Sequence, residues 1–175
     1  MTFTAEYEAR RDGPETDIRD HLQYMHDAAR KYPRCRVLEL GTRTGESTSA
    51  FLAAAEKTRG HVWSCDIDPP QVPPHWLESR LWTFTQADDM GAVLPQPVHV
   101  DVLFIDTSHA YGHTIAELYK FVPRVVPGGT VLLHDTEWRP PDHPVAQALD
   151  TYCAEMNWKW RNHPGSFGLG EIEIR

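Results

Sequence analysis

The chain has 175 residues, of which 41% are hydrophobic, enough for one domain with a sizeable core. Asp and Glu number 25 against 17 for Lys and Arg, which gives a formal net charge of -8. An acidic surface repels a phosphate backbone, so nucleic acid is excluded as a general partner.

The cysteines and the apolar runs indicate the compartment. Cys35, Cys65 and Cys153 are odd in number and form no C-x-x-C pair, which predicts free thiols in a reducing environment. Residues 1–13 lack the apolar core of a signal peptide, and the apolar stretches are too short to cross a bilayer. We therefore expect a cytoplasmic protein with no membrane partner.

The hydrophobic pattern predicts helices that alternate with short strands. An amphipathic helix is expected over residues 14–31, where apolar side chains recur at helical spacing until Pro33. The following runs predict, in chain order, a strand at 36–40, a helix at 47–58 closed by Gly60, strands at 61–65, 81–85 and 100–105, a helix at 111–122, a strand at 130–133, a helix at 145–156, and strands at 158–161 and 171–174.

This alternation predicts an α/β fold with a doubly wound, mostly parallel sheet. The last two strands have no helix between them, and the turn-rich residues 162–166 join them. Pro164 and Gly165 cannot belong to a central strand, so an antiparallel C-terminal edge hairpin is expected. We expect a single domain over residues 1–175, with an N-terminal helical segment at 1–33 and the α/β core at 34–175.

Acidic residues follow the predicted strands, where sheets of this kind bind their ligands. A single carboxylate at such a position would be ordinary for a helix cap. Here one occurs at the end of each of the first five strands, which favours a binding edge: Glu39, Asp66, Asp88, Asp106 and Asp135.

The glycine turn after the first strand indicates which cofactor this edge accepts. Gly41 and Gly45 enclose three other residues, so the middle glycine of the dinucleotide motif G-x-G-x-x-G is missing. Glu39 would also bring negative charge to a bound pyrophosphate. S-adenosylmethionine has no phosphate and carries a sulfonium and an ammonium group, and Asp66 is placed to bind its ribose hydroxyls. The turn therefore favours S-adenosylmethionine over NAD.

The motif V-L-E-L-G-x-x-x-G-x-S, followed by an acidic residue after the second strand, resembles the cofactor motif of class I S-adenosylmethionine-dependent methyltransferases. Residues 101–111, 128–135 and 168–170 are similar to small-molecule O-methyltransferases of the catechol O-methyltransferase-like and bacterial sugar or antibiotic type. The resemblance covers roughly residues 36–174. It implies a Rossmann-like methyltransferase fold and methyl transfer to a hydroxyl of a small molecule, such as a sugar or natural product.

The resemblance also implies where the cofactor is bound. Glu39, Gly41 and Ser47 would line its methionine end, Asp66 would hold the ribose and Asp88 would lie at the adenine. Arg43 either pairs with the cofactor carboxylate or faces solvent. The full expected cofactor-binding set is Glu39, Gly41, Arg43, Gly45, Ser47, Asp66, Asp88 and Asp106.

Many relatives hold magnesium through an Asp after the fourth strand and an acidic or amide pair after the fifth. Asp106 and Asp135 match the first two positions, but Thr136 stands where the second member of the pair would be. Two interpretations stay open. Either Asp106 and Asp135 bind Mg2+ or another divalent metal, or Asp106 contacts the cofactor and Asp135 caps a loop.

Transfer to an alcohol also needs a group that removes the hydroxyl proton. His109, three residues after Asp106, is the first candidate base, and His134, beside Asp135, is the second. The alternative for both is a histidine hydrogen-bonded within its own loop. Trp138, in the Pro-rich loop 137–144, is either a cover for the acceptor pocket or a partly buried aromatic.

Two other classes of function compete with a methyltransferase that acts on a small-molecule partner. One is a non-catalytic module that has kept the fold, which the missing second metal carboxylate favours. The other is an NAD-dependent oxidoreductase, which the absent middle glycine and Glu39 oppose. Assembly into a homo-oligomer is left open.

Overall fold

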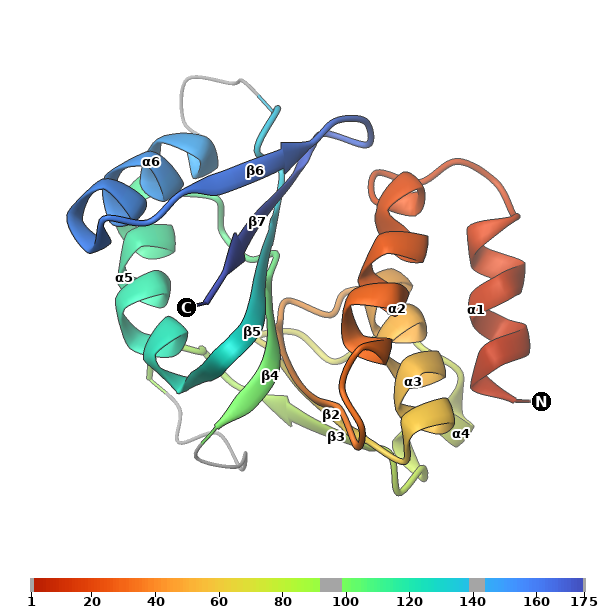
Figure 1. Ribbon diagram of the computed structural model, residues 1–175. Coiled ribbons are helices and arrows are strands. Elements are labelled where there is room, and N and C mark those ends of the chain that lie inside the picture. Colours follow the sequence, from red (N-terminus) through yellow and green to blue (C-terminus); the bar gives the residue numbers. More distant parts are fainter. Residues whose placement is uncertain (1, 92–98, 139–143, 175) are drawn as a thin grey trace.

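The computed structural model describes residues 2–91, 99–138 and 144–174. Seven strands form one sheet in the order β3-β2-β1-β4-β5-β7-β6 (Figure 1). The strands are β1 (Arg36–Leu40), β2 (His61–Asp66), β3 (Trp82–Gln86), β4 (Val100–Ile105), β5 (Val125–His134), β6 (Trp160–His163) and β7 (Leu169–Glu173). The helices are α1 (Phe3–Arg11), α2 (Leu22–Arg30), α3 (Glu46–Thr58), α4 (Pro74–Leu77), α5 (Tyr111–Phe121) and α6 (Val145–Met156), with 3-10 turns η1 (Arg19–His21) and η2 (Val122–Arg124).

The sheet is parallel from β3 to β5, and its order reverses beside β1. Strand β1 pairs with β2 on one side and with β4 on the other, both in parallel register. The crevice at the carboxyl ends of these strands is where doubly wound sheets bind ligands. The predicted α/β, doubly wound architecture is therefore confirmed, and it fixes where a site is to be sought.

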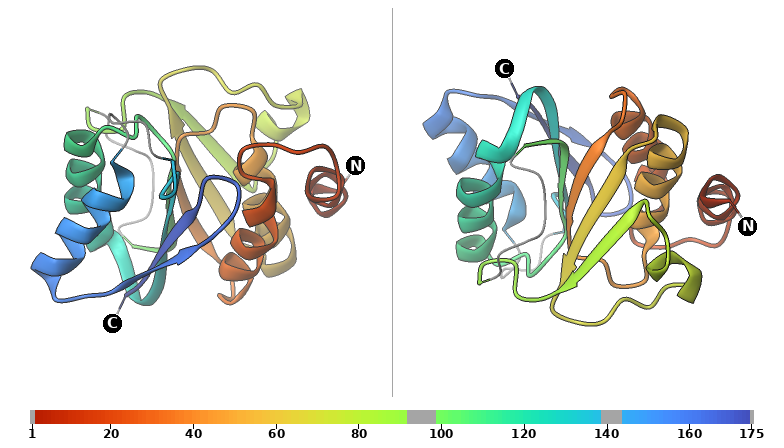
Figure 2. Two further views of the ribbon diagram at one scale, coloured as in Figure 1. Left: turned by 90° about the horizontal axis from the view of Figure 1, so that it is seen from above. Right: turned by 90° about the horizontal axis from the view of Figure 1, so that it is seen from below.

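Side chains alternate between two cores, one on each face of the sheet. Val37 of β1 packs with α1, α2 and α3, whereas Leu38 and Leu40 pack with α5 and α6. Views from above and below show the two helical layers on opposite sides of the sheet (Figure 2). Strand β4 is buried along its whole length, as its continuous apolar run predicts.

The C-terminal strands form the antiparallel hairpin that the sequence predicts. Strand β7 pairs antiparallel with both β5 and β6, which places β6 at the edge. Pro164 and Gly165 lie in the turn between β6 and β7, where Gly165 adopts a φ of 95°. The turn of the hairpin lies beside the carboxyl end of β5, and therefore at the edge of the sheet where ligands are expected.

The N-terminal region differs from the prediction. Residues 3–11 form α1, which the sequence analysis left without an element; Thr2 caps it by accepting a hydrogen bond from the Ala5 N–H. The predicted helix at 14–31 is wrong in its first half. Helix α2 begins only at Leu22, after turns and η1, and these turns bring Asp17 to the ligand edge. Apolar spacing alone did not separate η1 from a regular helix.

Smaller differences lie at the ends of elements. Strand β5 begins at Val125, five residues before the predicted strand, because Gly128 and Gly129 are accommodated within it. Cys35, Cys65 and Cys153 are buried free thiols, as expected. Within the described ranges, no helix is long and apolar enough to cross a membrane.

Helix α3 ends at Thr58, as predicted, but the left-handed residue that closes it is Arg59 and not Gly60. The exposed Arg59 adopts a φ of 58°, a left-handed conformation that costs a non-glycine residue about 1–2 kcal/mol. We expect Arg59→Gly to raise the free energy of unfolding by about 1 kcal/mol in chemical denaturation. The control Lys57→Gly, at an exposed position inside α3, should lower it by about the same amount. A destabilised Arg59→Gly would contradict this account of the helix end.

Candidate active site

A cavity of about 490 Å³ opens at the carboxyl ends of β1, β2 and β4, a volume typical of small-molecule sites. Its lining comes from residues 17–18, the turn after β1, the loop after β2, the turn after β3 and the start of the β4–α5 connection. Of the residues predicted for the site, Gly41, Arg43, Ser47, Asp66, Asp88, Asp106 and His109 line the cavity, and Glu39, Gly45, His134 and Asp135 do not.

The two glycines of the turn are required by close packing. A Cβ on Gly41 would lie 1.9 Å from the Asp106 carbonyl oxygen, and its φ is 89°. A Cβ on Gly45 would lie 2.6 Å from Val72 and 2.9 Å from Trp76. Gly41 therefore lets β1 and β4 end side by side under the cavity. Gly45, which was predicted to bind the cofactor, packs against the loop after β2 and does not line the cavity.

Glu39 also takes a place different from the expected one. Its side chain is fully buried and accepts hydrogen bonds from Ser47 Oγ at 2.6 Å, Thr48 Oγ1 at 2.8 Å and Ser64 Oγ at 2.5 Å. Burial raises the pKa of Glu39 to about 7, although the three hydroxyls partly offset this effect. Glu39 lies beneath the cavity and ties the end of β1 to β2 and to the start of α3.

Asp66 holds the glycine turn and faces the cavity at the same time. Its Oδ2 accepts the backbone N–H groups of Thr42 at 2.7 Å and Arg43 at 3.0 Å, and its Oδ1 accepts that of Asp68 at 3.0 Å. Each carboxylate oxygen has two lone pairs, so Oδ2 is fully engaged, whereas Oδ1 can still accept from a ligand hydroxyl. Asp88, in the turn after β3, is exposed and caps the Met90 N–H at 2.8 Å.

Arg43 reaches across the cavity mouth to the N-terminal region. Its guanidinium pairs with Asp17 Oδ2 at 2.5 Å, while two thirds of the side chain remains exposed. Its φ of 45° orients the side chain out of the turn. Asp17 was missed by the sequence analysis because it falls in the segment predicted as helix. The ion pair links the glycine turn to residues 17–18 at the rim.

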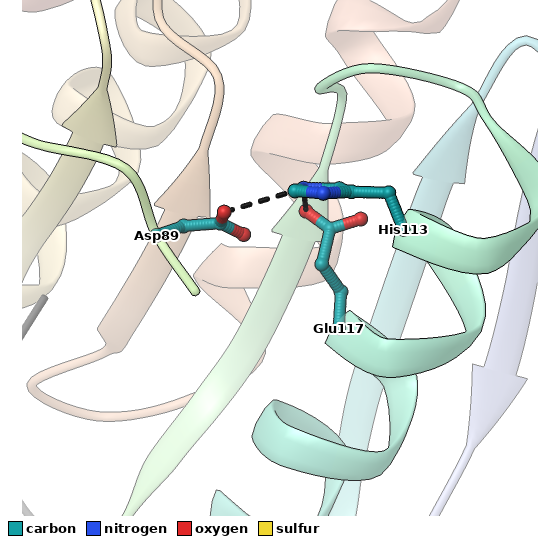
Figure 3. A group of neighbouring side chains, drawn as sticks. All are labelled: Asp89, His113 and Glu117. Carbon is teal, nitrogen blue, oxygen red and sulfur yellow. Dashed lines mark ion pairs between the residues drawn. The ribbon is translucent and has the colours of Figure 1, made fainter. Parts of the chain in front are cut away.

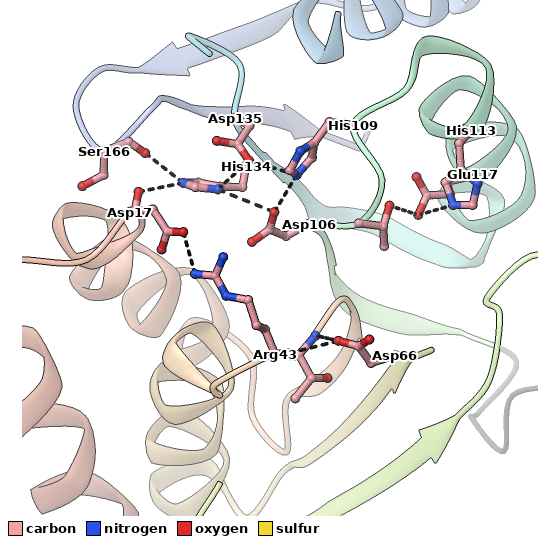
Figure 4. A network of polar contacts seen from close by, with 12 residues as sticks. Asp17, Arg43, Asp66, Asp106, His109, His113, Glu117, His134, Asp135 and Ser166 are labelled. Atoms are coloured by element: carbon pink, nitrogen blue, oxygen red, sulfur yellow. Dashed lines mark hydrogen bonds and ion pairs between the residues drawn. The ribbon is translucent and has the colours of Figure 1, made fainter. Parts of the chain in front are cut away.

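At the ends of β4 and β5, two carboxylates and two imidazoles meet (Figure 4). His109 Nε2 lies 3.0 Å from Asp106 Oδ1 and 2.9 Å from Asp135 Oδ2. His134 Nδ1 lies 3.3 Å from Asp135 Oδ2 and 3.6 Å from Asp106 Oδ1. Both His109 and Asp135 have positive φ values, which turn their side chains toward this cluster. The sequence analysis singled out all four residues, and the fold brings them together.

The two carboxylates and the two imidazoles shift each other's pKa values in opposite directions. Burial alone would lower the pKa of His109, but hydrogen bonds and charges of Asp106 and Asp135 outweigh it and raise the pKa to about 9. The same balance raises the pKa of His134 to about 10. Burial would raise the pKa of Asp106, but the two histidines hold it well below its ordinary value. The cluster is thus a compact charge-balanced network.

His134 is enclosed, which disfavours it as a candidate base. It is 2% exposed, and its Nε2 lies 2.8 Å from the Ser166 carbonyl and 3.1 Å from the Asp17 carbonyl, so this nitrogen carries the proton and donates. Only Nδ1 faces the carboxylates. Thr136, which stands at the expected second metal position, donates instead to Asn162 Oδ1 at 2.5 Å. His134 and not Thr136 thus completes the group around Asp106 and Asp135.

Asp89, His113 and Glu117 form a second cluster at another end of the cavity, and the sequence analysis assigned none of them a role. His113 Nε2 lies 3.3 Å from Asp89 Oδ1 and 3.6 Å from Glu117 Oε1. Burial, together with the neighbouring Asp89, raises the pKa of Glu117 to about 9. The i, i+4 spacing of His113 and Glu117 on the predicted helix was the available signal, because it places both on one face.

Trp138 lies beside the cluster of His109 and Asp135. Its ring centroid is 6.1 Å from that of His109 and 5.0 Å from that of Phe167, and the side chain is 37% exposed. This position fits both interpretations of Trp138, as a cover for the acceptor pocket and as a partly buried aromatic. The rest of the loop, residues 139–143, lies outside the described residues.

With this geometry in hand, the chain can be compared with known proteins. A family model described as a methyltransferase domain matches residues 38–136, more than half of the chain. The chain belongs to this methyltransferase family. The predicted resemblance to class I methyltransferases, whose cofactor is S-adenosylmethionine, is thereby confirmed. No curated protein sequence matches the chain.

Solved structures of other methyltransferases have the same fold. The SAH-bound Podospora anserina methyltransferase PaMTH1 is 15% identical, with 99% of this chain and 88% of that chain covered and a TM-score of 0.67. CalS11, a TDP-rhamnose 3'-O-methyltransferase of calicheamicin biosynthesis, is 14% identical over 98% and 92%, with a TM-score of 0.66. TomG from Streptomyces achromogenes, solved with SAM, is 15% identical over 98% and 89%, with a TM-score of 0.63.

The buried position of Glu39 predicts a specific pH dependence of stability. Its pKa is about 7 in the folded methyltransferase, above the ordinary value of 4.5. The folded state therefore holds this proton more tightly, and the contribution of Glu39 to stability is full below pH about 4.5 and lost as the pH rises through about 7.

We expect the free energy of unfolding of the wild type, minus that of Glu39→Gln, to fall between pH about 4.5 and about 7 and to be flat above. Denaturant titrations across this range measure the difference, which cancels the titration of the other carboxylates. A difference that is flat or rises with pH would show that Glu39 is ionised in the fold.

Proposed function

We propose that this methyltransferase transfers the methyl group of S-adenosylmethionine to a hydroxyl of a small molecule, such as a sugar or natural product. The observation that carries the proposal is the cavity itself. Its walls combine an acidic edge for a cationic cofactor with a carboxylate–imidazole cluster for an acceptor hydroxyl. Similar solved structures, CalS11 among them, are O-methyltransferases.

The cofactor is proposed to lie along the turns after β1, β2 and β3. Asp66 would accept from a ribose hydroxyl through Oδ1, and Asp88 would lie at the adenine. Gly41 and Ser47 would line the methionine end, and Arg43 would either bind the cofactor carboxylate or keep its ion pair with Asp17. Seven of the residues that line the cavity are acidic and one is an arginine, a balance that favours a sulfonium cation and opposes a pyrophosphate. An NAD-dependent oxidoreductase is therefore disfavoured.

The acceptor is proposed to bind on the side of Asp106 and His109. S-adenosylmethionine supplies the reactive methyl group when it is bound. The acceptor oxygen forms the new O–C bond as the C–S bond breaks, and its proton must leave. His109 lines the cavity and is held by Asp106 and Asp135, so we assign its neutral form the role of taking this proton. Because the pKa of His109 is about 9, this form increases as the pH rises toward that value. The buried His134 positions the two carboxylates.

The residues around Asp135 also suit a divalent metal ion. One ligand atom each of Asp106, His134 and Asp135 lies within 4.8 Å of the others, and Asp135 Oδ1 is buried without a hydrogen-bond partner in the described structure. We propose that Asp106 and Asp135 bind Mg2+ or another divalent ion. Their oxygens together with water suit Mg2+, whereas a bond from His134 Nδ1, which is also in reach, would suit a transition-metal ion. Such an ion would supply a positive charge beside the acceptor oxygen. MycE, a structural neighbour of 16% identity, was solved with Mg.

A non-catalytic module remains the competing function, and turnover decides between them. A charge-balanced cluster lies at the cavity wall, which favours the enzyme, because a module that only binds the cofactor needs no such cluster. We also propose a cytoplasmic location, in line with the buried free thiols.

Calorimetry tests the cofactor assignment. We expect the wild type to bind S-adenosylmethionine and to give no heat with NAD. Asp66→Ala should weaken S-adenosylmethionine binding by about 10- to 100-fold, as expected for lost hydrogen bonds to a carboxylate. The matched control Glu78→Ala, at an exposed position away from the cavity, should bind like the wild type. Unchanged affinity of Asp66→Ala would remove Asp66 from the ribose.

Formation of S-adenosylhomocysteine with a panel of catechols and deoxysugar-bearing compounds tests the reaction. With the best acceptor, His109→Gln should lower kcat by about 100-fold or more while leaving the affinity for S-adenosylmethionine nearly unchanged. The control is Thr136→Val, which should keep the wild-type kcat because the Thr136 hydroxyl donates to Asn162 and not to the cluster.

A chelator should lower the rate, and added Mg2+ or Mn2+ should restore it. Full activity in the chelator would leave Asp106 and Asp135 as positioning groups for His109. Turnover by His109→Gln at the wild-type rate would remove His109 as the base, whereas the absence of turnover on every acceptor, despite cofactor binding, would favour the module.

A further inference from the structure

Asp89, His113 and Glu117 form a second cluster of metal-binding side chains, separate from the residues around Asp135 (Figure 3). Asp89 belongs to the turn after β3, and His113 and Glu117 lie one helical turn apart on α5. Figure 3 shows the two carboxylates facing each other beside the imidazole. One ligand atom of each residue lies within 4.8 Å of the others. Three donors from two elements thus converge on one point.

The two carboxylates are buried and incompletely paired. The Glu117 side chain is 0% exposed and that of Asp89 is 7% exposed. Glu117 Oε2 and Asp89 Oδ2 have no hydrogen-bond partner in the described parts of the chain. A buried acceptor without a donor costs about 1–3 kcal/mol, more when it is charged. Such a pair needs either a cation or a shared proton between its members.

Neighbouring groups supply little of that positive charge. Lys120 Nζ donates to the backbone carbonyls of Asp89 at 2.5 Å and Met90 at 3.0 Å, not to the carboxylates. Thr107 Oγ1 donates to Glu117 Oε1 at 2.7 Å but is neutral. The His113 imidazole carries at most one charge against two carboxylates. When both carboxyl groups are ionised, these contacts leave a deficit of positive charge, which a bound cation would offset; without a cation, the proton on Glu117 offsets it.

We propose that Asp89, His113 and Glu117 bind a divalent transition-metal ion, with Zn2+ and Mn2+ as the best matched. An imidazole nitrogen and two carboxylates form a mixed donor set that suits these ions, whereas Mg2+ prefers oxygen ligands and keeps its waters. Three protein ligands leave at least one coordination position open. Asp89 and His113 line the cavity, so that position faces the end of the cavity near Asp88.

The site would fasten a turn to a helix. Strand β3 and α5 are separated in sequence, and the turn that holds Asp88 and Asp89 contacts α5 through this cluster and Lys120. A metal ion there fixes the position of Asp88 at the cavity wall. This inference does not depend on the proposed methyl transfer, because it concerns metal uptake by the chain itself.

Metal titration of the full chain tests the proposal. The protein is treated with chelator, dialysed and titrated calorimetrically with ZnCl2, MnCl2 and MgCl2. The double variant Asp106→Asn/Asp135→Asn removes the other cluster, and we expect it to bind one equivalent of Zn2+ or Mn2+ more tightly than Mg2+. Glu117→Gln in this background should weaken that binding by at least about 100-fold, since loss of an outer-shell partner alone costs 10- to 100-fold.

Two further variants keep the test decisive. Glu78→Gln makes the same chemical change at an exposed position and should bind like its parent. If Glu117→Gln does not fold, His113→Gln replaces a partly exposed ligand and should lose the same equivalent. No uptake of Zn2+ or Mn2+ by the double variant, or uptake by Glu117→Gln at parental affinity, overturns the proposal. A Glu117→Gln protein that is more stable and binds no less metal would indicate a shared proton instead.

Discussion

The buried carboxyl group of Glu39 is the interaction on which the ligand edge depends. It receives one hydroxyl from β2 and two from the first turn of α3, so three elements meet at the end of β1. A group buried this completely is costly unless it is hydrogen-bonded, and three donors meet that need. The arrangement holds the start of α3 against the sheet. The glycine turn that forms the cavity floor spans the short distance between them.

Contacts of Asp66 and Gly41 connect this arrangement to the cavity. Asp66 accepts the N–H groups of Thr42 and Arg43, so the turn after β1 is bound to the end of β2. Gly41 lies against the Asp106 carbonyl with no room for a side chain. The carboxylates of Asp66 and Asp106 therefore stand at fixed separation on either side of the switch in strand order. Preorganisation of this kind lets a site orient two reactants with little loss on binding.

Much of the fold could be predicted because its signals are local. The apolar run of β4 and the periodicity of α6 give their bounds directly, and the turn residues around Pro164 indicate the hairpin. The start of α2 and the helix α1 could not be placed the same way. Whether residues 14–18 are helical depends on contacts with distant segments, such as the Asp17 carbonyl with His134.

The sequence predicts which residues gather at the candidate site, but not how deeply each of their side chains is buried. Strand ends identify which carboxylates share an edge, and Asp66, Asp88 and Asp106 do line the cavity. Whether a side chain points up to the ligand or down into the core depends on strand alternation and packing, which placed Glu39 and His134 inside. Which side chains come together as possible metal ligands also depends on the three-dimensional fold. His134 lies beside Asp106 and Asp135, where Thr136 offers no carboxylate or amide, and Asp89 lies beside His113 although the two are distant in sequence.

We propose that the acidic edge binds S-adenosylmethionine above Glu39 and without contact to it. A crystal structure of the full chain with S-adenosylhomocysteine would show this. We expect a ribose hydroxyl at Asp66, the amino acid end over the Gly41 turn, and Glu39 still bonded to its three hydroxyls without touching the ligand. A ligand bound elsewhere, or a Glu39 carboxylate turned into the cavity to contact it, would show that this placement of the cofactor is wrong.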